Sequence, residues 1–153
     1  MKYLLSALII TIVTSGCSTR NAFSKLEVGL DEEYAIENTR SGKIKIDEQI
    51  TGVFSSVYLN NFYKNIDKST NQFYISVYSK TKEEGLKFTL NKKNPLLVQR
   101  LACNNEFVSL LPLQTKWTQN YLVSFEDTQL NTLTLKIDIG PSSSGPLSYL
   151  KDQ

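Results

Sequence analysis

Few residues in this chain of 153 could carry out catalysis, because it contains no histidine and only two cysteines. Without histidine, Ser-His-Asp and Cys-His hydrolysis are excluded and the commonest metal ligand is missing. The sequence has no glycine-rich phosphate loop and no paired-cysteine metal motif. Two carboxylates could still cleave a glycosidic bond. The candidates for such a pair are Glu83, Glu84, Glu106, Glu126 and Asp127.

Each of these carboxylates stands beside lysine, asparagine or threonine in a segment that we predict to be a turn. Charged residues in such segments are usually solvated. We therefore expect no enzymatic activity, no cofactor and no metal site.

Tyrosine is the other residue type that could form a functional surface. Four tyrosines fall within the 21 residues from 58 to 78, namely Tyr58, Tyr63, Tyr74 and Tyr78. In a strand over 72–79, Tyr74 and Tyr78 share one side, and exposed tyrosines offer a large contact area with a polar tip. We predict a binding surface there. The alternative is that both sides of the strand are covered, or that the rings pair across strands.

Two further residues are predicted to be buried. Cys103 follows Leu101 and Ala102, which suggests a small core residue. An intermolecular disulfide is the alternative for Cys103. The single tryptophan, Trp117, is also expected in the core.

The elements that would position these residues are strands, because apolar and polar residues alternate with a period of two from residue 71 onward. The segment 52–66 also fits a helix, but its β-branched and aromatic residues favour a strand over 53–59. Leu96, Leu97 and Val98 form a denser apolar run that predicts a central strand. Strands are predicted over residues 43–47, 53–59, 72–79, 86–91, 96–101, 107–113, 121–125, 133–139 and 147–150.

Short strands separated by turns every ten residues or so predict an all-β fold. We expect an antiparallel, immunoglobulin-like β-sandwich of about seven to nine strands over 43–153, with a small β-barrel as the alternative.

The first seventeen residues have the composition of an export signal. Lys2 precedes the apolar run Leu4 to Val13, which is too short to span a bilayer, and small residues lead to Cys17. Residues 14–17 resemble the lipobox of bacterial lipoproteins, in which the cysteine carries a diacylglycerol and becomes the new N-terminus. The alternative is an ordinary secretory signal followed by an unrelated cysteine. We expect a signal peptide over 1–16 and a lipidated tether over 17–42.

The resemblance also has implications for location and function. Ser18 stands where an aspartate would retain a Gram-negative lipoprotein at the inner membrane, so the outer membrane is implied, on its periplasmic face or at the cell surface. Removing Lys2 leaves 16 basic against 15 acidic residues, which gives no field to attract nucleic acid. The outline is similar to that of immunoglobulin-like lipoproteins of Gram-negative bacteria. It implies a non-enzymatic protein-binding or envelope-assembly module. The alternatives are an adhesin or antigen, a toxin-immunity lipoprotein, or a carrier of a small apolar ligand.

Overall fold

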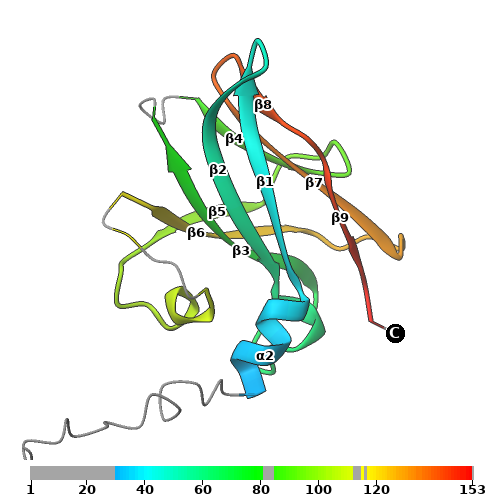
Figure 1. Ribbon diagram of the computed structural model, residues 1–153. Coiled ribbons are helices and arrows are strands. Elements are labelled where there is room, and N and C mark those ends of the chain that lie inside the picture. Colours follow the sequence, from blue (N-terminus) through cyan, green and yellow to red (C-terminus); the bar gives the residue numbers. More distant parts are fainter. Residues whose placement is uncertain (1–29, 81–84, 112–114, 116, 153) are drawn as a thin grey trace, which may run out of the picture.

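The computed structural model describes residues 30–80, 85–111, 115 and 117–152 (Figure 1). Cys17, the predicted leader, Glu83 and Glu84 lie outside these residues. Within them the protein is mostly strand, as the sequence predicts. The elements in chain order are helix α2 (Leu30–Glu37), strands β1 (Thr39–Ile46) and β2 (Gln49–Tyr58), the 3₁₀ helix η2 (Leu59–Asn61), strands β3 (Thr70–Ser79), β4 (Leu86–Leu90) and β5 (Leu97–Leu101), the 3₁₀ helix η3 (Glu106–Leu110), and strands β6 (Gln119–Glu126), β7 (Thr132–Ile139), β8 (Ser142–Ser144) and β9 (Leu147–Leu150).

The strands form one antiparallel sheet that curls into a half-barrel (Figure 1). Its order is β4-β7-β8-β1-β2-β3-β6-β5, and β9 also pairs with β7. The all-β antiparallel prediction is confirmed. Because the described strands belong to one continuous sheet, the form is nearer to the barrel alternative than to two separate layers.

Inside the curl lies a core of alternate side chains from the strands, which we call the inner core. The ring centroids of Phe88 on β4 and Tyr121 on β6 lie 5.5 Å apart, so strand β4 at one end of the sheet packs across the interior against β6 near the other end. Strand β7 shows the alternation most cleanly, since Leu133, Leu135 and Ile137 have no exposed surface. The inner core comprises Ile44, Phe54, Tyr58, Phe73, Ile75, Val77, Phe88, Leu90, Tyr121, Val123, Phe125, Leu133, Leu135, Ile137, Ile139 and Tyr149.

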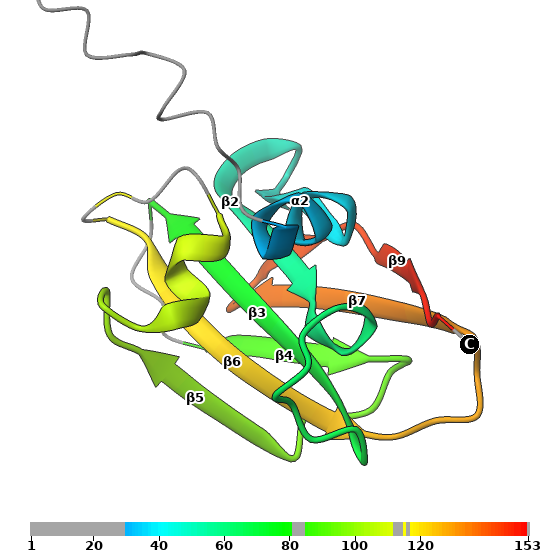
Figure 2. The ribbon, with the colours of Figure 1, turned by 90° about the horizontal axis from the view of Figure 1, so that it is seen from below.

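A second apolar cluster, the outer core, covers the opposite face of β2 and β3. Helices α2 and η3 contribute to it, and Figure 2 shows α2 lying over β2. A hydrogen bond stabilises the connection between α2 and β1, where the Thr39 hydroxyl donates to the Ala35 carbonyl at 2.5 Å. The outer core comprises Ala35, Val57, Leu59, Tyr74, Leu101, Phe107, Val108, Leu110 and Leu111.

Three local features differ from the sequence-based expectation or settle an open alternative. Residues 53–58 belong to strand β2, which decides between the strand and helix interpretations of that segment. The first strand begins at Thr39 rather than near Lys43. The strand predicted from Phe107 is wrong, because Asn105 caps the 3₁₀ helix η3 by accepting the Phe107 amide hydrogen on its side chain.

Candidate functional site

The structure separates the four tyrosines that the sequence placed on one surface. Tyr74 has no exposed surface, and its hydroxyl donates to Asn120 Oδ1 at 2.9 Å. It belongs to the outer core because α2 and η3 cover the side of β3 on which it lies. The prediction of an exposed surface is therefore wrong for Tyr74, because both sides of β3 are covered at this residue.

The other three tyrosines lie in three different surroundings. Tyr58 is buried in the inner core, where its hydroxyl donates to Asn71 Oδ1 at 2.9 Å, and burial raises the pKa of Tyr58 well above its usual value. Tyr63 is half-buried and donates to Glu106 Oε2 at 2.7 Å. Tyr78 is exposed beside Val53 on the outer face of the sheet. Tyr58 is therefore not part of the predicted surface either.

Cys103 and Trp117 are both exposed, so the expectation that they are buried is wrong. Each lies in a turn beside a strand rather than in the strand itself. Cys103 follows the end of β5, where the Asn105 amide hydrogen bonds to the Ala102 carbonyl at 3.0 Å. Trp117 lies in the turn that the Thr118 amide closes on the Thr115 carbonyl at 3.1 Å.

The described carboxylates that the sequence offered for catalysis each bind a neighbouring group. Glu126 pairs with Lys93 at 2.8 Å and Asp127 with Lys151 at 2.6 Å. The hydrogen bond from Lys93 lowers the pKa of Glu126, and the bond from Lys151 lowers the pKa of Asp127. A general acid needs a raised pKa, so both shifts run in the opposite direction.

Strand β5 is the part of the fold that sequence reasoning placed wrongly and that has the character of a contact surface. Instead of lying in the centre of the sheet, it forms one end of the strand order and, among the described strands, pairs only with β6 (Figure 2). Leu97 is 54% exposed and Val98 44% exposed. Leu96, just before the strand, is also exposed. An apolar strand at the margin of a sheet is therefore open to solvent.

The exposed side chains of β5 lie on both faces of the sheet. Val98 is opposite Val123, which belongs to the inner core, so Val98 lies at the open mouth of the half-barrel. Leu97 comes directly before Val98 and projects from the other face of the sheet, because side chains alternate along a strand. A free strand edge offers backbone donors and acceptors to an incoming extended segment, and flanking apolar side chains add contact area.

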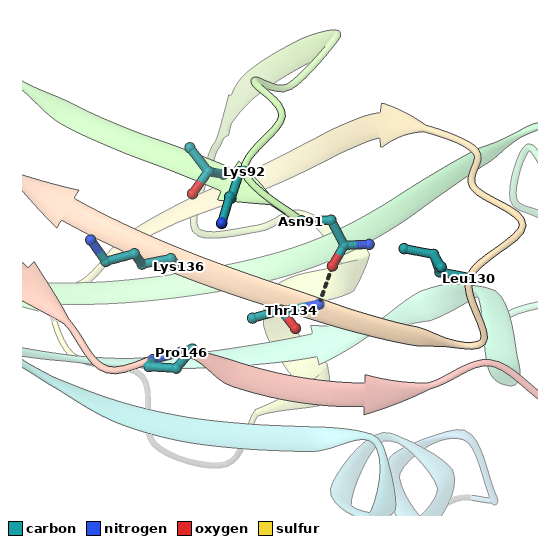
Figure 3. A pocket seen from close by; sticks show the side chains of 7 residues that line it. Asn91, Lys92, Leu130, Thr134, Lys136 and Pro146 are labelled. Carbon is teal, nitrogen blue, oxygen red and sulfur yellow. Dashed lines mark hydrogen bonds between the residues drawn. The ribbon is translucent and has the colours of Figure 1, made fainter.

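A separate feature is a groove on the outer face of β4 and β7, with a volume of about 480 Å³ (Figure 3). It is lined by Thr89, Asn91, Lys92, Leu130, Thr134, Lys136 and Pro146. No local pattern in the sequence could indicate this groove, because its lining residues come from four separate segments. Inside the half-barrel, Val123, Leu133 and Leu135 have no exposed surface, so these core side chains line no open cavity.

Among the described residues, no helix is both long enough and apolar enough to cross a bilayer. In the same part of the chain, no group of three or more His, Cys, Asp or Glu residues comes together to hold a metal ion. Comparison of the chain with protein-family models, with curated proteins and with solved structures gives no match.

Proposed function

We propose that this protein is a lipid-anchored lipoprotein of the outer membrane that acts without catalysis, by binding another protein along strand β5. The anchor rests on the leader, in which an apolar run from Leu4 to Val13 precedes small residues and Cys17. The binding role rests on one structural observation, the exposed apolar strand at the margin of the sheet.

Burial of this strand would release appreciable free energy. Fully burying a leucine or valine side chain contributes about 1.5–3 kcal/mol. Leu96, Leu97 and Val98 are each roughly half exposed or more, so a partner that covers them gains about 1 kcal/mol from each. Hydrogen bonds from a strand added to the edge supply register and specificity. The occupant that fits best is an extended segment of a partner polypeptide with alternating apolar side chains.

The same edge carries features that limit indiscriminate association. Pro95 precedes the strand, Arg100 places a charge on it, and the strand has only five residues. Natural sheets use proline, charge and short length to blunt their edges. The partner must therefore tolerate the guanidinium, which favours an acidic or polar residue opposite Arg100.

The experiment uses two valines that differ in position but not in exposure. Val98 on the edge is 44% exposed, and Val53 in the middle of the sheet is 43% exposed. Val53 lies on β2, which is paired on both sides with β1 and β3. We expect Val98→Asp to abolish a cross-linked species that the full-length protein forms in the native envelope, and Val53→Asp to leave it unchanged. Equal effects of the two substitutions would contradict binding along β5.

The anchor requires a separate experiment. Cys17→Ser should release the protein into the soluble periplasmic fraction and abolish its labelling by a clickable palmitate analogue. Membrane retention of the Cys17→Ser chain, or a wild-type chain that takes up no label, would contradict lipidation. Protease treatment of intact cells then distinguishes a periplasmic module from a surface adhesin.

A further inference from the structure

We propose that the groove over β4 and β7 is a binding site for a small amphiphilic carboxylate, of the kind represented by a medium-chain fatty acid. This site is separate from strand β5. It would give the protein a small-molecule ligand in addition to a protein partner.

The groove is formed on the outside of the sheet by side chains that alternate with the inner core. Thr89 on β4 is opposite Lys136 on β7 in the register, and Thr134 follows on the same face. Leu130 enters from the segment before β7, and Pro146 from the segment before β9 (Figure 3). A volume of about 480 Å³ lies within the usual size range of small-molecule sites, roughly 300–1,000 Å³.

One polar group in the groove is a hydrogen-bond donor that has no partner in the part of the chain that the structure describes. The Asn91 side chain accepts the Thr134 amide hydrogen on Oδ1 at 2.9 Å, which fixes the orientation of its amide. Its Nδ2 is buried and donates to no atom among the described residues. Figure 3 shows this nitrogen on the side facing Leu130, away from the Thr134 bond. An unpaired buried donor costs about 1–3 kcal/mol, so an acceptor on a ligand would be favoured there.

The turn after strand β4 places the side chain of a lysine, Lys92, in the lining of the groove. Asn91 and Lys92 have φ angles of 49° and 68°, and the turn is closed by mutual backbone bonds between Leu90 and Lys93. This is the backbone of a tight hairpin turn, and it places Lys92 in the wall of the groove. Among the described residues, no salt bridge involves Lys92.

The balance of charge indicates a monoanion. Lys136, the second lysine in the lining, pairs with Asp138 at 3.2 Å, so its charge is largely compensated. Lys87 is opposite Asp138 in the register but does not line the groove. The uncompensated charge in the lining is therefore that of Lys92, which matches one carboxylate.

The apolar side chains in the lining indicate that the ligand has an apolar part as well as an anionic group. Exposed lysines bind a small anion weakly in water because the interaction is screened. Leu130 is exposed at one end of the groove, next to Asn91, and Pro146 lines the groove on the side of Lys136 (Figure 3). A hydrocarbon chain laid over these residues would remove apolar surface from water. The chemistry of the groove thus favours a carboxylate head on an apolar tail.

The test is calorimetric titration of the full chain carrying Cys17→Ser with decanoate, decanol and acetate, below the micelle concentration of decanoate. We expect one decanoate per chain and weaker binding of decanol and acetate. Lys92→Met, which keeps the aliphatic stem, should weaken decanoate about 10-fold. Lys87→Met, on the same face of the sheet but outside the lining, should leave it unchanged.

Chemical shifts locate the site independently. Decanoate should shift the signals of Leu130 and Asn91 and leave those of Leu97 on β5 in place. Absence of binding by the folded protein, equal binding of acetate and decanoate, or equal affinity of the wild-type and Lys92→Met chains would each overturn the proposal.

Discussion

Substitution of Tyr74 tests the two-sided burial of the sheet, on which the position of the contact surface depends. The Tyr74 ring is fully buried in the outer core, and its hydroxyl donates to buried Asn120. Tyr74→Phe removes that donor while keeping the ring, and we expect a loss of about 1–3 kcal/mol because Asn120 Oδ1 loses a partner. Tyr74→Ala also leaves a cavity, which raises the expected loss to about 4 kcal/mol or more.

These free energies translate into measurable shifts of the melting temperature. For a domain of this size, 1 kcal/mol corresponds to roughly 3–5 °C. Tyr74→Ala should therefore lower Tm by about 12–20 °C and Tyr74→Phe by about 3–15 °C. Tyr78→Ala is the matched control on the same strand. Its ring is 37% exposed, so we expect a loss of about 1 kcal/mol.

Circular dichroism of the full chain carrying Cys17→Ser follows the melting of the sheet directly. A Tyr74→Ala chain that melts within a few degrees of the parent would refute the burial of Tyr74. The side of β3 that carries Tyr74 would then be exposed, and the tyrosine surface predicted from the sequence would replace strand β5 as the proposed binding surface.

The remaining predictions concern the pH dependence, the exposed aromatic residue and the exposed thiol. Hydrogen bonds from Lys151 and Ser69 lower the pKa of Asp127 and Asp67 respectively below the usual 3.8. The stability that these two carboxylates contribute is thus complete above about pH 4 and is lost as pH falls through their lowered pKa values. Asp127→Asn should therefore reduce the dependence of the free energy of unfolding on pH, as measured by acid-unfolding curves. Trp117 is 66% exposed, so its fluorescence should be quenched by acrylamide almost as strongly in the native as in the unfolded protein. Cys103 should react with a maleimide in the native state at a rate close to that of a free thiol, and slow reaction would contradict its place in the turn after β5.

The alternation of residues was sufficient to predict the strands that form the inner core. Leu133, Leu135 and Ile137 are buried while Thr134, Lys136 and Asp138 lie on the outer face of β7, as a period of two requires. Local pattern cannot show which strands stand next to each other. It therefore could not show that Leu97 and Val98 lie at the end of the sheet rather than at its centre.

The covering of Tyr74 could not be predicted for a related reason. The residues that bury it come from α2 and η3, which lie far from β3 in the sequence. One local signal was present, since Asn105 before Glu106 is a typical helix cap, and it could have indicated η3. The groove over β4 and β7 depends wholly on long-range packing of four segments.

Site-specific photo-cross-linking in the native envelope tests the proposed binding edge most directly. The strand order ends in β5 on one side and in β4 on the other, and of these two strands β5 alone carries exposed apolar side chains, whereas Lys87 lies outward on β4. A photo-reactive residue at position 97 of the full-length lipidated protein should capture one specific protein, and the same residue at position 87 should capture none. Equal capture at the two positions, or capture at position 87 alone, would contradict the account.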